Sequence, residues 1–165
     1  VAAADVPRFA RLGATANLQA LWAAHDEQLD RLVLPFLPEG TANRLYPFGD
    51  LAAAGAELAG GSDWPVSTPD PIQAIHVAVQ RSRPGSERSP LGPASQRLTP
   101  AQIVTAYTRG SARVNHLDHA TGALAPGYHV DLAILDRNLF ELPGEDLHTA
   151  RVDETCIGGR RVFTR

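Results

Sequence analysis

The chain has 165 residues, of which 15 are Lys or Arg and 18 are Asp or Glu, so its formal net charge is −3. This balance, without a basic stripe, argues against a nucleic-acid partner, and the single cysteine, Cys156, excludes an internal disulfide or a cysteine-based zinc site. No apolar run has the roughly 18 residues of a membrane span and no signal-peptide pattern occurs, so we expect a cytoplasmic protein without a membrane partner. Methionine is absent even at position 1, and we therefore expect the C-terminal part of a longer protein.

Residues 5–13 predict a short helix, because Val6, Phe9 and Leu12 recur three positions apart on one face and Gly13 supplies a stop. The mostly apolar residues 14–22 then predict a buried strand.

Asn17 and Gln19 would point to the same side of that strand, where they either line a polar pocket or are hydrogen-bonded inside the fold. The polar cluster at residues 25–27 is interpreted as a solvated loop, because neighbouring residues do not face one another on a helix. Residues 42–55 predict a helix that ends at Gly55.

A short apolar run at residues 57–61 stops abruptly at a carboxylate, Asp63. The run predicts a buried strand with Ser62 and Asp63 at its carboxyl end, after which Trp64-Pro65 turns the chain away. In sheets of parallel strands, this end is where active sites are built. Asp63 is therefore the main candidate for chemistry, although an aspartate before an aromatic residue and proline is also a common turn former.

Two capped helices follow. The segment Asp70-Pro71-Ile72-Gln73 has the pattern of a helix start, and we expect His76, well inside that helix, to be structural. Residues 81–97 are rich in Ser, Pro, Gly and Arg and predict a mobile surface loop.

A second helix start, Thr99-Pro100-Ala101-Gln102, opens a helix that runs to about His116. His116 and His119 are three residues apart, but they fall at the fraying end of this helix, so we do not assign them to a metal site.

The end of the chain changes in character. A turn-rich segment at residues 121–127 precedes a predicted strand at residues 129–136, and two more strands at residues 152–155 and 160–163 flank a hairpin signal at Gly158-Gly159.

Three of these stretches resemble the amidohydrolase superfamily, specifically its YtcJ-like (amidohydrolase 3) branch. They are residues 61–66 followed by Asp70-Pro71, then Tyr46-Pro47 with Leu51 and Gly55, and the turn and strand carrying Gly122, Leu124, Pro126, Gly127, Asp131 and Leu132 before the Gly158-Gly159-Arg160 hairpin. In this family a Gly-x-Leu-x-Pro-Gly turn precedes an Ala-Asp-Leu strand, and here Val130 replaces that alanine.

The resemblance implies an α/β fold: the C-terminal portion of a (β/α)8 metal-dependent hydrolase barrel in residues 1–120, and strands of a small β-sandwich in residues 121–165. Asp63 matches the aspartate at the end of the eighth barrel strand, which contacts the metal and shuttles a proton from the attacking water to the leaving group. Trp64, Asn17 and Gln19 are the candidates for the substrate pocket.

The implied activity is hydrolysis of C–N bonds, amide or related, of a small molecule by metal-activated water. The cofactor would be one or two divalent ions, expected to be zinc, in the full-length protein. The family's remaining ligands, including a His-x-His pair, are not found here, so we expect the isolated chain to be inactive and to need the missing N-terminal barrel half, or to form a homo-oligomer. The alternatives are a non-catalytic module that binds a partner chain through exposed strand edges, and an unrelated α/β binding domain.

Overall fold

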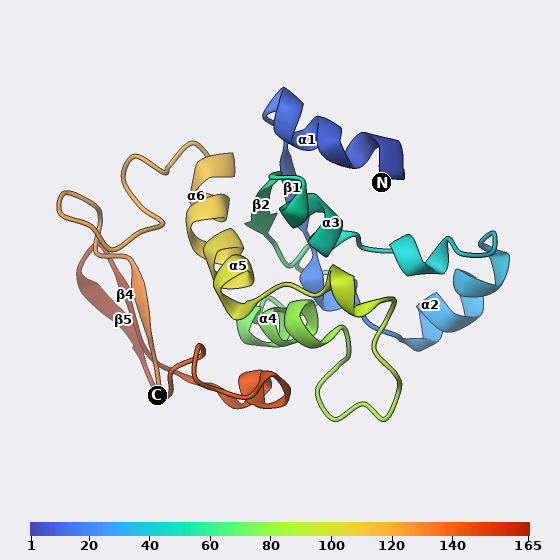
Figure 1. The fold of residues 1–165 in the computed structure, drawn as a ribbon. Helices are drawn as coiled ribbons and strands as arrows, with labels where there is room; N and C mark the ends of the chain where they lie inside the picture. Colours follow the sequence, from blue (N-terminus) through green and yellow to red (C-terminus); the bar gives the residue numbers. More distant parts are fainter.

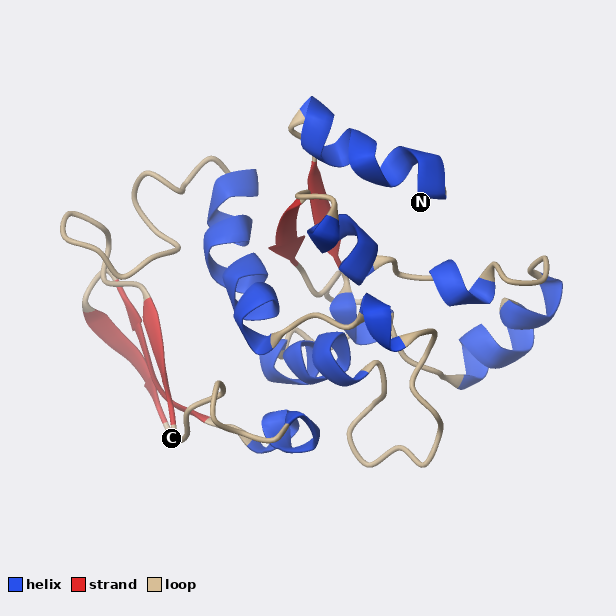
Figure 2. Ribbon diagram, viewed as in Figure 1, coloured by secondary structure: helices blue, strands red, loops and turns tan.

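Two separate sheets organise the fold, which the computed structural model describes for residues 1–165. β1 (Thr15–Leu18) runs parallel to β2 (Glu57–Gly60) in the first sheet. β3 (Leu132–Leu135), β4 (Val152–Ile157) and β5 (Arg160–Thr164) form the antiparallel second sheet. Figure 1 shows a column of helical segments standing between the two sheets, and Figure 2 shows how much of the chain is helix. The predicted α/β class is confirmed.

The helices are short, and several are single turns. In chain order they are η1 (Ala3–Asp5), α1 (Val6–Leu12), η2 (Ala20–Trp22), α2 (Glu27–Leu32), η3 (Leu34–Phe36), η4 (Ala42–Arg44), α3 (Phe48–Ala53), α4 (Pro71–Gln80), η5 (Ala94–Gln96), α5 (Pro100–Thr105), the π-helical η6 (Ala106–Gly110), α6 (Ser111–Val114) and η7 (Gly144–Thr149). None of them combines the length and apolar character that crossing a bilayer requires.

Helix ends that depend on local signals form as predicted. Gly13 closes α1 with a φ of 63°, in the left-handed conformation that glycine adopts without a steric penalty. The Asp70 carboxylate accepts a hydrogen bond from the Ile72 N–H at the start of α4, at 2.9 Å. Thr99 and Gln102 form a complete capping box at the start of α5.

Two predictions in the first third of the chain are wrong. Residues 25–27 are not a solvated loop, because the Asp26 carboxylate accepts from the Leu29 N–H at 2.7 Å and caps α2. The predicted helix over residues 42–55 is two elements, η4 and α3. Tyr46 precedes Pro47 and has a φ of 52°, so the helical conformation is interrupted there.

The predicted surface loop over residues 81–97 is tied into the core by Arg81, whose side chain is fully buried. Its guanidinium donates to the carbonyls of Leu91 at 3.0 Å, Tyr46 at 3.0 Å and Leu45 at 2.8 Å. The same group lies 5.3 Å from the centre of the Phe48 ring. The prediction of a surface loop is therefore wrong at Arg81 and again at Leu91 and Gln96, which are also buried. It holds for the exposed residues 85–90 between them.

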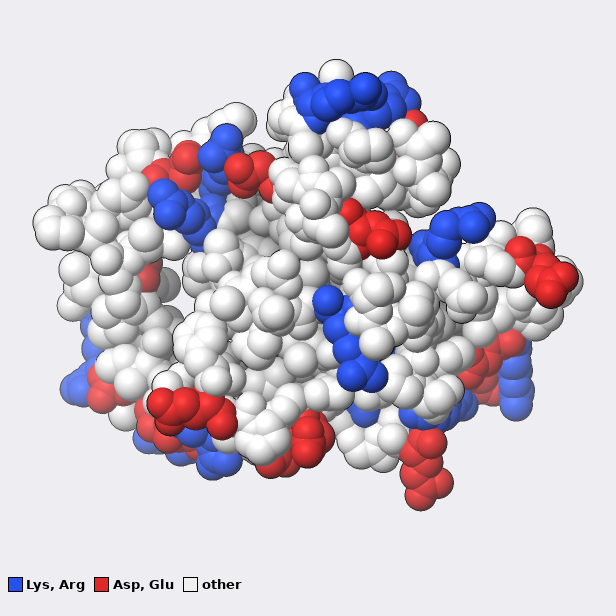
Figure 3. Space-filling view, viewed as in Figure 1, with Lys and Arg blue, Asp and Glu red and all other residues white.

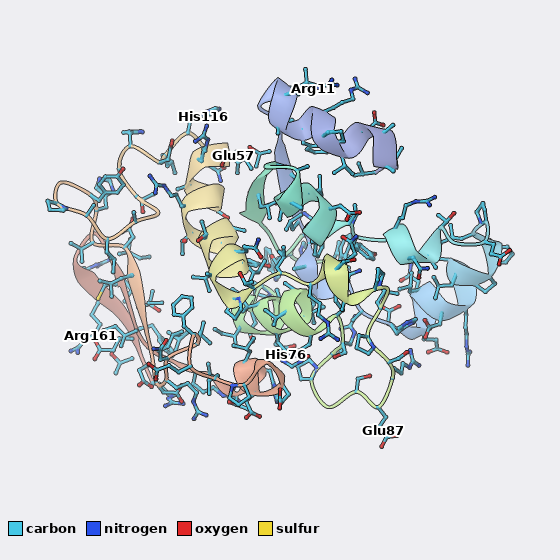
Figure 4. The ribbon with its side chains drawn as sticks, viewed as in Figure 1. Arg11, Glu57, His76, Glu87, His116 and Arg161 are labelled. Carbon is cyan, nitrogen blue, oxygen red and sulfur yellow. The ribbon has the colours of Figure 1, made fainter.

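The hydrophobic core gathers around α4, whose buried residues include Ile72, Ile75 and Val77. α4 packs against η2 on one side, against η7 on another, and against α5. His76 of α4 is buried as well, and it lies on the side of the helix that faces η7, as Figure 4 shows. The segment between β2 and α4, which contains Asp63, therefore leads directly into this core.

Candidate active site

The two parallel strands end side by side, and their ends define the candidate site. Leu18 pairs with Gly60, and the Gly61 N–H donates to the Leu18 carbonyl at 3.0 Å, which extends the pairing beyond β2. Because parallel strands present their carboxyl ends at the same edge, the segments after Leu18 and after Gly60 emerge together. Asp63 lies just past the end of a parallel strand, as predicted, but of the residues of β2 only Ala59 is buried, so the prediction of a buried strand is wrong.

Close packing against η6 holds the end of β2 in place. A Cβ atom on Gly60 would lie 2.6 Å from the Tyr107 ring, and one on Gly110 would overlap the Leu58 carbonyl oxygen. The Ser111 hydroxyl donates to the Gly60 carbonyl at 2.8 Å, and the Tyr107 hydroxyl donates to the Gly61 carbonyl at 3.3 Å. These glycines let the strand and helix backbones approach closely.

Burial, with a smaller effect from the charge of Asp70, raises the pKa of Tyr107 to about 12. Tyr107 therefore stays a neutral hydroxyl donor at the end of β2 throughout the physiological pH range.

Asp63 lies at the tip of a tight turn after β2. Its φ of 54° is in the left-handed region, which is sparsely populated by residues other than glycine, asparagine and aspartate. The turn is closed by hydrogen bonds from the Val66 N–H to the Asp63 carbonyl at 2.9 Å, and from the Trp64 N–H to the Ser62 hydroxyl at 3.2 Å. The Ser67 hydroxyl donates to the Ser62 carbonyl. The side chain of Asp63 is exposed, so it is accessible for chemistry.

The other predicted pocket residues lie in different surroundings. Asn17 is exposed between the buried Ala16 and Leu18, and its Oδ1 would lie 3.2 Å from a Cβ atom on Gly61, so it is next to the end of β2. Gln19 is half-buried and lines, together with Asn17, a hollow of about 450 Å³ along β1. Trp64 is 68% exposed, so its ring is not enclosed by neighbouring side chains.

A cavity of about 570 Å³ adjoins the Asp63 turn, and sequence reasoning missed it. Its lining combines Trp22, from the turn after β1, with Val66 and Thr68, from the segment after Asp63. Gln73 and Arg83 add polar groups from α4 and from the segment after it. Arg83 is held there by an ion pair with Asp26, at 3.2 Å. These residues come from four separate segments, so no local pattern in the sequence signals the cavity.

The histidines do not complete a metal site with Asp63. Figure 4 shows Glu57, at the start of β2, and His116, just after α6, at the same end of the molecule, and Arg113 of α6 lies 3.5 Å from Glu57. Asp63 follows the opposite end of β2. His116 and His119 are both exposed.

No group of three or more His, Cys, Asp or Glu side chains is placed to hold a metal ion. A structural or catalytic zinc ion needs at least three protein ligands, and the segment after β2 offers one carboxylate. The residues of this chain therefore do not fit a metal ion by themselves.

His76 is a buried histidine with a different role. Its ring lies edge-on to that of His148, with the ring centres 4.9 Å apart, and its Nδ1 atom has no hydrogen-bond partner. Burial, with a smaller contribution from His148, lowers the pKa of His76 to about 4. His76 is thus a neutral core residue, in agreement with its predicted structural role.

Comparison with known proteins gives a consistent result. The family model described as "Amidohydrolase family" matches residues 1–163. The chain is 31% identical over 156 residues to the protein LONG AFTER FAR-RED 3 of Arabidopsis thaliana, covering 94% of this chain and 26% of that protein. It is 28% identical over 160 residues to the protein of Bacillus subtilis (strain 168) named "Putative amidohydrolase YtcJ", covering 97% of this chain and 30% of that protein.

Two solved structures have a similar fold. A crystal structure of an amidohydrolase from Thermotoga maritima MSB8 superposes with a TM-score of 0.63 at 17% identity, covering 99% of this chain and 35% of that one. A second crystal structure, of an uncharacterized protein, superposes with a TM-score of 0.59 at 16% identity, covering 100% of this chain and 39% of that one. The chain spans less than a third of the length of the two curated relatives, LONG AFTER FAR-RED 3 and YtcJ.

Proposed function

Because the chain belongs to the amidohydrolase family, we propose that it supplies part of the active site of a hydrolase that cleaves C–N bonds, amide or related, of a small molecule. The observation that carries this proposal is the placement of Asp63. It is an exposed carboxylate at the tip of a tight turn, three residues past the end of the parallel strand β2. Polar residues in this position, at the carboxyl ends of parallel strands, are the usual components of active sites.

In this proposal, Asp63 accepts a proton from the attacking water and returns one to the leaving nitrogen. A carboxylate suits this task because its oxygens can both accept and return a proton, and the exposed side chain of Asp63 is accessible to water. Asp63 would also be one ligand of a divalent metal ion, expected to be zinc, whose other ligands lie outside these residues. The ion would lower the pKa of water towards neutrality when bound.

The active unit is accordingly a longer polypeptide. β1 pairs with β2 along one edge only, and its surroundings are a hollow lined by Phe9, Phe48 and Leu51. We propose that β1 and β2 are neighbouring strands of a (β/α)8 barrel, and that strands from the rest of that barrel pair at this open edge. The three-stranded sheet β3–β5 would belong to a small β-sandwich beside it. The expected cytoplasmic location and homo-oligomer stay predictions.

The test is a substitution in the full-length polypeptide. Asp63→Asn keeps the size of the side chain and removes its basicity, so hydrolysis of acyl anilides in the presence of zinc is expected to fall about 100-fold or more. Asp118→Asn, at an exposed carboxylate after α6, is the matched control and should leave the rate unchanged. Equal rates for Asp63→Asn and the unsubstituted protein would refute the proposed role of Asp63.

A non-catalytic module is the second candidate, and the open edge of β1 favours it. It predicts that the full-length polypeptide with added zinc hydrolyses none of the anilides. It also predicts that the chain binds a partner through strand pairing at the open edge of β1. Asn17→Pro, which removes a backbone N–H from β1, should then abolish this binding. Measurable hydrolysis that depends on Asp63 would rule it out.

A further inference from the structure

A second cleft lies between the start of α4 and the last strands. Its volume is about 620 Å³, and its lining comes from segments before, within and after α4, and from the open end of the β4–β5 hairpin. Figure 1 shows the C-terminal end of β5 on the same side of the molecule as η7. The cleft shares Leu21, Gln73 and Arg83 with the cavity next to the Asp63 turn but includes no residue of that turn.

The charge of this cleft is opposite to that of the chain. Three arginines, Arg83, Arg151 and Arg165, line it against a single carboxylate, Asp70, in a protein with a formal net charge of −3. His148 lies among the lining residues as well. On the face drawn in Figure 3, by contrast, charged side chains of both signs are interspersed.

The arginines differ in how far their charge is compensated. Arg83 pairs with Asp26 at 3.2 Å, and Arg165 pairs with Asp153 at 2.8 Å. The Arg151 guanidinium donates only to backbone carbonyls, those of His148 and Ala150, both at 3.0 Å. Both bonds use the same nitrogen, Nη1, so the remaining N–H groups of Arg151 are free to bind an anion. Its positive charge has no carboxylate partner.

The single acid in the cleft, Asp70, is used to cap a helix. The Asp70 carboxylate accepts from the Ile72 N–H at 2.9 Å and caps α4. This carboxylate offsets the partial positive charge at the start of α4. The uncompensated positive charge of the cleft is therefore that of Arg151.

The walls between the charged groups are apolar. Leu21, Val152 and Phe163 line the cleft, and Phe163 leaves 48% of its surface exposed. A guanidinium binds a carboxylate or phosphate through paired hydrogen bonds, and a partly exposed aromatic ring packs against an apolar body. From this combination we propose that the cleft binds a small organic anion, a carboxylate or phosphate carried on an apolar or aromatic group.

The proposal is independent of the hydrolytic role of Asp63, and a binding measurement tests it. Titration calorimetry on the full-length polypeptide at low salt uses phenyl phosphate as the probe, with benzyl alcohol as its neutral counterpart and inorganic phosphate as its counterpart without a ring. Phenyl phosphate is expected to bind at one site, more tightly than either counterpart, and more weakly as salt is added.

Two variants locate the site. Arg151→Gln is expected to weaken phenyl phosphate binding about tenfold or more, since it removes the charge-assisted hydrogen bonds to the phosphate. Arg160→Gln, at an exposed arginine of β5 outside the cleft, removes the same charge and should leave binding unchanged. Phe163→Ala should weaken phenyl phosphate binding while sparing inorganic phosphate.

The proposal is overturned if phenyl phosphate does not saturate, if both arginine variants weaken it equally, or if benzyl alcohol binds as tightly. A thermal melt of each variant shows that it is folded. Because Arg151 is exposed, the Arg151→Gln variant is expected to have the same melting temperature as the unsubstituted protein.

Discussion

Replacing Arg81 by methionine tests whether one buried cation holds the segment after α4 against the core. The guanidinium makes three hydrogen bonds, to the carbonyls of Leu91, Tyr46 and Leu45, and none to a carboxylate. Burial lowers the pKa of Arg81 to about 10, so the side chain still carries its charge at neutral pH. Methionine keeps most of the side-chain volume but leaves all three carbonyls without this donor.

The magnitude follows from these contacts. A hydrogen bond to a charged group contributes on the order of 1.5–3 kcal/mol, but the burial of the charge itself offsets part of the sum. We therefore expect Arg81→Met to lower the free energy of unfolding by about 3–5 kcal/mol, a large share of the roughly 5–15 kcal/mol of a typical domain.

Urea denaturation followed by circular dichroism measures the change, with Arg97→Met as the control at an exposed arginine of the same segment. The control should change the free energy of unfolding by no more than about 0.5 kcal/mol. If Arg81→Met also stayed within about 1 kcal/mol of the parent protein, the three hydrogen bonds would not stabilise the fold as argued.

Three further predictions use the same measurement. The pKa of His76 is lowered to about 4, so unfolding takes up a proton as pH falls below about 6.5; stability should be full above that pH and about 2 kcal/mol lower at pH 5, and His76→Leu should lose this dependence. Gly110→Ala, which would press a methyl group into the Leu58 carbonyl, should cost about 1–3 kcal/mol, whereas Arg109→Ala on the exposed side should be nearly neutral. Thr99→Ala breaks the capping box of α5 and should lower the free energy of unfolding by about 1 kcal/mol, whereas Thr108→Ala, at an exposed threonine that bonds only backbone carbonyls of its own helix, should change it very little. Three outcomes would contradict these arguments: an unchanged free energy of unfolding for Thr99→Ala, the same for Gly110→Ala, or a parent protein whose stability does not depend on pH.

The parts of the fold that were predictable from sequence depend on residues close together in the chain. The Thr99–Gln102 capping box, the Asp70 cap and the glycine stop at Gly13 are such signals, and all three form. The hairpin between β4 and β5 likewise follows from Gly158-Gly159. The cap at Asp26 was also readable, because a short polar residue precedes α2, but it was not recognised.

What could not be predicted depends on contacts across long stretches of chain. Arg81 reaches carbonyls more than thirty residues away, at Tyr46 and Leu45, and no local pattern marks an arginine that will be buried. The same holds for Arg83 and Gln73 beside the Asp63 turn. The position of Asp63 was predictable because it depends only on where a short apolar strand ends. The boundary at residues 120–121 stays a prediction.

The backbone of Asp63 has a consequence for laboratory evolution. Glycine fits a φ of 54° with less steric conflict than any residue bearing a Cβ atom. A library screened for heat resistance alone should therefore enrich glycine or asparagine at position 63, while a screen for turnover should retain the acid. The two screens would then select different residues at position 63. The difference in thermal stability between the selected variants would measure the stability that is lost by keeping a carboxylate at this position.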